Sequence, residues 1–143
     1  MPVFSRHVTV DWSGPLREGG KGVATAGTGA FNLPVSFLRR VGEPEGVTSP
    51  EELIAAAHAS CFSMALSGAL AKAGNPPERL RTSATVTFVP GTGITKSALT
   101  VRGSVPGLDA DGFREAAEGA KQNCPVSQAL AGVPEITLDA QLD

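Results

Sequence analysis

The hydrophobic pattern of the chain changes twice, from alternation to a nearly continuous apolar run and back to alternation. Within residues 3–13 apolar side chains occur at every second position, which predicts a half-exposed strand. Two further strands are expected at 23–28 and 31–37, with glycine-rich turns between them. The N-terminal part is therefore predicted to be an antiparallel meander, followed by an irregular connector over residues 38–49.

The apolar run predicts one long helix over residues 50–74. Ser49 is a suitable N-cap, Pro50 fits the first helical position, and Gly74 before Asn-Pro-Pro is a stop signal. Apolar residues cover most of the helix circumference, which is typical of a helix buried on nearly all sides. We therefore expect a central helix that other elements enclose.

The remainder of the chain alternates again. The expected elements are strands at 80–89 and 94–105, helices at 112–123 and 126–130, and a strand at 135–142. Pro125 interrupts the helical pattern and leaves Cys124 at the start of the short second helix. This order of elements predicts an α+β fold with mostly antiparallel sheets.

Composition narrows the class of protein. A chain of 143 residues with 18% charged and 41% hydrophobic residues predicts a single globular domain over 1–143. A net charge of -2 gives no reason to expect nucleic acid or an anionic membrane as a partner. His58, Ser60 and Ser63 interrupt the apolar helix, so we expect no membrane span. Because no signal-peptide pattern is visible at the N-terminus, a cytoplasmic location is expected.

The two cysteines are the main candidates for chemistry. A lone thiol on an apolar helix, such as Cys61, is ordinarily a small core residue, but Cys124 begins a helix, where backbone amides lower a thiol pKa. Two such thiols suit a reactive cysteine and a resolving partner. His58 lies three residues before Cys61 on one helical face, which leaves a Cys–His pair as an alternative to a core histidine. No cluster has ligand spacing, so we expect neither a metal nor a cofactor.

At these residues the chain resembles a known family. Residues 49–66, with the run His-Ala-Ser-Cys-Phe-Ser-Met-Ala-Leu, resemble the central helix of the OsmC/Ohr family, and Asn-Cys-Pro-Val-Ser-Gln at 123–128 resembles its second-cysteine motif. The resemblance extends essentially from end to end and is stronger to the OsmC branch. It implies a thiol-dependent peroxidase that reduces organic hydroperoxides, and also hydrogen peroxide, with an external dithiol as reductant. It also implies an intertwined homodimer in which mostly antiparallel sheets wrap around long central helices.

The resemblance assigns roles to individual residues. Cys61 matches the peroxidatic cysteine, Cys124 the resolving cysteine, and Glu51 the acid that follows the proline. The catalytic arginine falls at Arg40, with Arg39 as the alternative because the connector is one residue longer than usual. A guanidinium beside sulfur would favour the thiolate, and the carboxylate of Glu51 would orient that guanidinium.

Helix geometry adds an expectation about assembly. Glu51 and Cys61 are ten residues apart, so on one helix their backbones are separated by about 15 Å along the axis. An arginine held by Glu51 can therefore reach a Cys61 only if that cysteine belongs to another chain. We expect an obligate homodimer with composite sites. Two other classes remain open: a ligand-binding stress protein with silent cysteines, and a hydrolase or acyl-transfer enzyme using Cys61 with His58.

Overall fold

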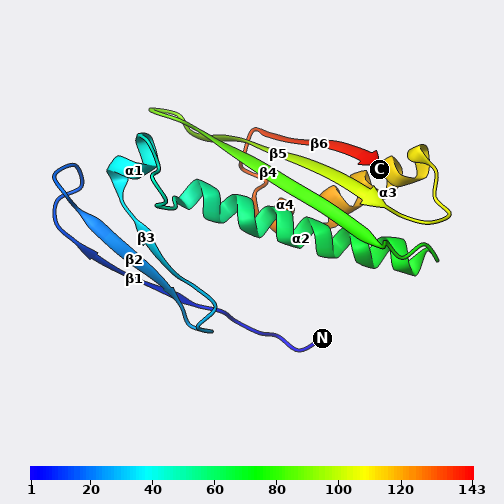
Figure 1. Ribbon diagram of the computed structural model, residues 1–143, viewed down its shortest axis with the longest axis horizontal. Helices are drawn as coiled ribbons and strands as arrows, with labels where there is room; N and C mark the ends of the chain where they lie inside the picture. Colours follow the sequence, from blue (N-terminus) through cyan, green and yellow to red (C-terminus); the bar gives the residue numbers. More distant parts are fainter. The chain divides into compact units, whose positions relative to one another are not determined.

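The computed structural model describes all residues, 1–143, and the chain forms two compact units, Met1–Pro50 and Glu51–Asp143. Figure 1 shows the first unit as a small sheet with a short helix and the second as a sheet with the longer helices. The expected single domain over 1–143 stays a prediction, because two compact units do not by themselves decide whether either folds alone.

The N-terminal unit is the predicted meander. Its strands are β1 (Val8–Ser13), β2 (Lys21–Ala26) and β3 (Asn32–Val35), paired antiparallel in the order β1-β2-β3. The expectation of a half-buried first strand is wrong for the single chain, because all six residues of β1 are exposed. Trp12 is 44% exposed, so the N-terminal unit covers its ring only in part.

The connector at 38–49 is less irregular than expected. It begins with a short helix, α1 (Phe37–Val41), which includes Arg39 and Arg40. The helix forms because Ser36 caps it, with its hydroxyl accepting a hydrogen bond from the backbone N–H of Arg39 at 3.2 Å. A five-residue helix is too short for apolar periodicity to predict, since it completes little more than one turn.

The predicted long helix is α2 (Pro50–Lys72), which runs without interruption for 23 residues. It ends as the stop signal indicates: Gly74 adopts a φ of +91°, and the backbone N–H of Asn75 donates to the carbonyl of Leu70 at 2.9 Å. The helix therefore confirms the prediction, with its last turn two residues shorter.

The second sheet consists of β4 (Arg79–Val89), β5 (Gly93–Ser104) and β6 (Glu135–Leu142) in that order. β4 and β5 pair antiparallel, whereas β5 and β6 pair parallel. A parallel pair needs a long crossover, which α3 (Ala110–Asn123) and α4 (Pro125–Ala129) provide. Two antiparallel meander pairs, one antiparallel β4–β5 pair and one parallel pair confirm the predicted α+β class with mostly antiparallel sheets.

The core of the second unit lies where α2, α3 and the second sheet meet. Its buried residues are Phe62, Leu66, Leu70, Leu99, Val101, Val105, Phe113, Ala117, Ala120, Cys124 and Ala140. α2 contributes residues at a spacing of four, which is one helical face.

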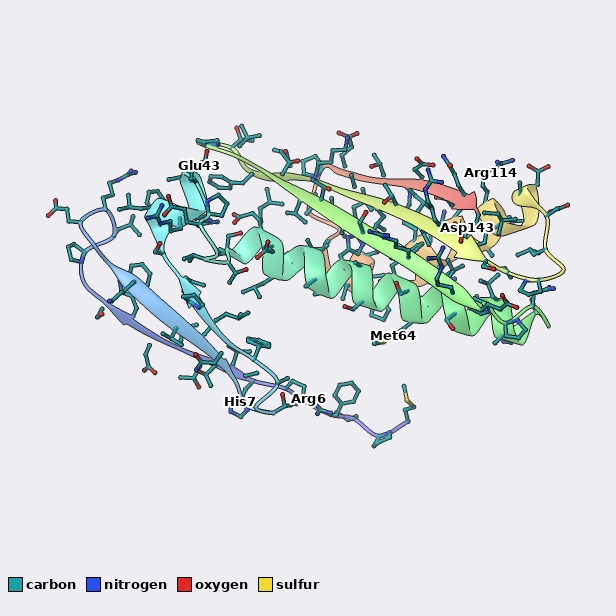
Figure 2. The ribbon with its side chains drawn as sticks, in the orientation of Figure 1. Arg6, His7, Glu43, Met64, Arg114 and Asp143 are labelled. Carbon is teal, nitrogen blue, oxygen red and sulfur yellow. The ribbon has the colours of Figure 1, made fainter.

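The opposite side of α2 is not covered. Met64 is 74% exposed and projects outward from the helix (Figure 2). Within its own unit, α2 is therefore not buried on nearly all sides, in contrast to the expectation from the sequence. By length and hydropathy alone α2 could also cross a membrane, although the core helix of a soluble protein meets the same criteria.

Candidate active site

The two thiols meet in the core of the second unit. Cys61 lies in the middle of α2, and Cys124 is the single residue between α3 and α4. Both are reduced, and their side chains are hydrogen-bonded to each other. Residues 63 positions apart in sequence are thus in direct contact, as a thiol and its resolving partner must be to form a disulfide.

Cys61 is partly buried and packs against the apolar core. Burial raises the pKa of its thiol, and the hydrogen bond from the backbone N–H of Val126 only partly offsets that effect. The neighbouring Cys124 raises the pKa further. Within this unit Cys61 is therefore a poor thiolate, and it needs a positive charge nearby to become a nucleophile.

Cys124 is fully buried, with none of its surface exposed. Burial acts to raise its pKa, but hydrogen bonds to the sulfur from the Ser127 and Val126 amides, the Ser127 side chain and Cys61 together hold the pKa below its ordinary value. Pro125 occupies the first helical position and α4 begins at once, which places these amides around the sulfur. The prediction of a depressed pKa at the start of this helix is confirmed.

His58 is a fully buried histidine whose two ring nitrogens both have partners. Nδ1 lies 2.7 Å from Oγ of Ser97, and Nε2 lies 2.8 Å from Oγ of Ser127. Neither nitrogen is directed to Cys61, so the sequence-level alternative of a Cys61–His58 pair is not supported. The interpretation of His58 as a core histidine whose ring nitrogens have hydrogen-bond partners is confirmed.

The two serines that hold His58 were not singled out by the sequence. Ser97 is on β5, where it shares the inward register of Leu99 and Val101, and its side chain is fully buried. A serine at an inward, otherwise apolar position of a strand indicates a buried polar partner, because buried hydroxyls are hydrogen-bonded. This was the signal in the sequence from which the role of Ser97 could have been predicted. No group of three or more His, Cys, Asp or Glu side chains in the chain could hold a metal ion.

The expected charged residues lie in different units. Glu51 is in the first turn of α2 and is buried, whereas Arg40 lies on α1 of the N-terminal unit and is half-buried. Arg39, the alternative, forms an ion pair with Glu45 at 2.8 Å and donates to the carbonyl of Glu43 at 3.3 Å. Arg39 is thus bound to the exposed surface of its own connector.

Comparison with known proteins identifies the family of this chain. The family model described as OsmC-like protein matches residues 42–139, which include both cysteines. The chain belongs to the OsmC-like protein family. Over 135 residues it is 47% identical to Peroxiredoxin OsmC of Escherichia coli (strain K12), with 92% of each chain covered. The same identity and coverage apply to Peroxiredoxin OsmC of Shigella flexneri.

Solved structures support the fold of this OsmC-like protein. An OsmC-like protein of unknown function from Vibrio cholerae superposes with a TM-score of 0.76 at 18% identity, covering 96% of this chain and 99% of the other. The organic hydroperoxide resistance protein OhrB of Bacillus subtilis gives a TM-score of 0.65 at 22% identity, covering 96% and 98%. At 18% and 22% identity, these similarities show a shared fold and no more.

Proposed function

We propose that this protein is a cysteine-based peroxidase that reduces organic hydroperoxides to alcohols, and hydrogen peroxide to water, with Cys61 as the attacking thiol and Cys124 as the resolving thiol. The observation that carries the proposal is the direct contact between two reduced thiols in a chain 47% identical to Peroxiredoxin OsmC. We name organic hydroperoxides as substrates because similar solved structures are described as organic hydroperoxide resistance proteins.

The chemistry follows from the two thiols. The Cys61 thiolate attacks the O–O bond of the hydroperoxide, releases an alcohol and becomes a sulfenic acid. Cys124 condenses with that sulfenic acid to give a disulfide and water. An external dithiol then reduces the disulfide by thiol–disulfide exchange, a step suited to the reducing cytoplasm, where we place the protein.

Access supports Cys61 as the attacking thiol, although Cys124 has the lower pKa. Cys124 has no exposed surface, so a hydroperoxide cannot reach its sulfur, whereas Cys61 is only partly buried. A low pKa in a closed position instead suits a resolving thiol, which needs only to reach the neighbouring sulfur. The raised pKa of Cys61 then explains why the site needs a guanidinium.

Arg40 is the arginine that we assign to this role, with Glu51 orienting it. Arg39 is less suited, because its ion pair with Glu45 and its bond to the Glu43 carbonyl hold its guanidinium at the exposed surface of the connector. A guanidinium never deprotonates near neutral pH, and it can bind a carboxylate and a thiolate at the same time.

A homodimer with composite sites accounts for the exposed apolar surfaces. α2 leaves one side uncovered, and β1 exposes Val8, Val10 and Trp12. The same helix is continuous from Glu51 to Cys61, so about 15 Å of helix separates them within one chain. If two copies of α2 cross antiparallel, Glu51 of each faces Cys61 of the other, and a two-fold axis makes two such sites. A second copy of the chain would thus cover the apolar side of α2, and no membrane is needed to account for that surface.

A peroxidase assay with variants tests the assignment. We expect the protein to consume an organic hydroperoxide continuously with a dithiol such as dithiothreitol. Cys61→Ser abolishes turnover. Cys124→Ser, treated with hydroperoxide in the absence of a thiol reductant, reduces one equivalent of peroxide per chain and forms no intrachain disulfide. Continued turnover in Cys61→Ser would contradict the proposal, and so would a native protein that consumes no peroxide.

A further inference from the structure

The buried histidine is part of a hydrogen-bonded chain that ends at Cys124. Ser97 on β5 contacts His58 on α2 at 2.7 Å, and His58 contacts Ser127 on α4 at 2.8 Å. The side chain of Ser127 is in turn hydrogen-bonded to the sulfur of Cys124. Three separate elements thus contribute to one continuous polar path in an otherwise apolar core.

The reaction with peroxide at Cys61 does not use this path. Burying an imidazole and two hydroxyls is unfavourable unless each is bonded, and here no buried side-chain nitrogen or oxygen lacks a partner. A well-packed apolar side chain could fill the same volume. The polar path therefore suggests a task at its end, which is the sulfur of Cys124.

The resolving step presents such a task. Cys124 must lose its proton to attack the sulfenic acid, because the thiolate is the nucleophile. Its sulfur has no exposed surface, so bulk water is not in contact with it to accept that proton. The side chain that reaches both Cys124 and a base is Ser127, and the base is His58.

We propose that His58 accepts the proton of Cys124 through the hydroxyl of Ser127 when the disulfide forms, and that Ser97 holds the imidazole in the tautomer this requires. The inference rests on the proposed roles of Cys61 and Cys124. Nδ1–H donates to Oγ of Ser97, which leaves Nε2 as an acceptor for the hydroxyl of Ser127. While Cys124 is a thiol, the Ser127 hydroxyl accepts from it and donates to Nε2. Ser127 then passes its proton to Nε2 as it takes the proton of the thiol. After the transfer, the hydroxyl donates to the thiolate, which is the hydrogen bond that lowers the pKa of Cys124.

The step balances. The Cys124 thiolate forms the S–S bond with Cys61 as the S–O bond of the sulfenic acid breaks, and the hydroxide that leaves takes up a proton and departs as water. When His58 releases its proton again, one sulfenic acid and one thiol have given one disulfide and one water. Burial lowers the pKa of His58, so the imidazole is neutral and able to accept a proton at neutral pH.

Substitutions along the path separate proton transfer from packing. Ser127→Ala breaks the path, and Ser127→Thr restores a hydroxyl. His58→Gln keeps an amide oxygen that can accept from Ser127 but cannot take up a proton. Ser83→Ala is the matched control, because it removes the hydrogen bond between Ser83 and Thr100 on the second sheet, away from the cysteines. Circular dichroism and thermal unfolding of each full-length variant establish that it is folded.

Rapid-quench experiments with tert-butyl hydroperoxide measure the two steps separately in the full-length proteins. Peroxide loss reports the attack by Cys61, and trapping of sulfenic acid against disulfide reports resolution. We expect Ser127→Ala and His58→Gln to form sulfenic acid at about the native rate and the disulfide about 100-fold more slowly. Ser127→Thr and Ser83→Ala form the disulfide within about threefold of the native rate, since both keep the path intact.

These experiments distinguish a failure of the proton-transfer inference from a failure of the proposed function. Disulfide formation at the native rate in His58→Gln overturns the inference and leaves His58 as a packing residue, and so does a native rate in Ser127→Ala. If the native protein forms no sulfenic acid at all, the proposed function fails before this step is reached. A measurement without mutations complements these variants. We expect the transfer of the thiol proton through Ser127 to limit disulfide formation, so this step is slower in heavy water in the native protein, and equal rates in the two solvents contradict that expectation.

Discussion

At the scale of single residues, one of the two thiols is accessible to substrate, and the other has the lower pKa. Cys124 has the lower pKa because amides and a hydroxyl donate to its sulfur, but it is closed to substrate. Cys61 is open enough to meet a hydroperoxide, but burial raises its pKa. A peroxidase cycle needs both properties, and the proposed cation beside Cys61 would supply the ionisation that its own surroundings oppose.

Arg40 is the residue to which we assign that ionisation. We expect Arg40→Lys to lower kcat/KM for an organic hydroperoxide on the order of 100-fold, because an ammonium cannot bind sulfur and a carboxylate in one plane. Arg39→Lys is the matched control and stays within about threefold, since an exposed ion pair contributes little. If the two effects are reversed, Arg39 is the catalytic arginine.

His58 makes stability depend on pH in a defined direction. Burial lowers its pKa below the ordinary value of 6.5, so below about pH 6.5 the unfolded chain binds a proton that the native chain does not. The contribution of His58 to the free energy of unfolding is therefore full above that pH, declines as the pH falls, and levels off below the native pKa. Urea unfolding between about pH 5 and 7 checks this. The decline is absent from His58→Gln, and parallel pH profiles of the two proteins would contradict the argument.

The residue-level predictions succeeded where chemistry is local. Cys124 before Pro125 indicates a thiol at the start of a helix, and that position alone explains its amide contacts. Ser97 could not be paired with His58 in the same way, because 39 residues separate them and only the packing of α2 on the sheet brings them together. The roles of Arg40 and Glu51 came from family resemblance and stay proposals.

At the scale of elements, regular periodicity explains what could be predicted. The alternation of β4 and β5 and the long apolar run of α2 each extend over ten or more residues, which is enough to define a period. α1 has five residues, and its presence depends on one cap at Ser36. The parallel direction of β6 depends on the crossover through α3 and α4, which a strand's own sequence does not encode.

The packing of α3 against β5 can be tested with two glycines. A Cβ at Gly103 lies 2.8 Å from the ring of Phe113, a fully buried residue of α3. Gly103→Ala is therefore expected to destabilise the protein by about 1–3 kcal/mol through overpacking. In Gly119→Ala the new Cβ, on α3, meets nothing within 4 Å, and a better helix former there stabilises by about 0.5–1 kcal/mol. Urea unfolding measures both, and a stable Gly103→Ala would show that this contact yields easily.

At the scale of the whole molecule, the exposed apolar surfaces of α2 and β1 are the surfaces that the proposed homodimer would cover. Met64 and Trp12 are exposed in different units, and each lies on a face that a single chain leaves open. The sequence predicts a helix apolar nearly all round, yet the chain buries only one of its faces. The proposed second copy would reconcile the two observations, and it would also let Glu51 act on a cysteine about 15 Å along the helix.

Complementation tests the composite sites. Cys61→Ser and Glu51→Ala chains are each inactive as homodimers. In a mixed dimer, Glu51 of the first chain faces Cys61 of the second, so one of the two sites is intact and about half of the native activity returns. Co-expression with two different affinity tags isolates the mixed dimer. No recovered activity in a pure mixed dimer would place Glu51 and Cys61 of one site on the same chain.

Cys61 and Cys124 are proposed to form one redox pair, which a map of the disulfide after oxidation tests directly. The reduced protein is treated with one equivalent of an organic hydroperoxide per chain, free thiols are alkylated, and peptides are identified by mass spectrometry without reduction. We expect one intrachain disulfide that joins Cys61 to Cys124, formed in step with alcohol release and reversed by a dithiol. Oxidation that leaves Cys124 free in the native protein, or a disulfide that joins Cys61 of two chains, would contradict the account.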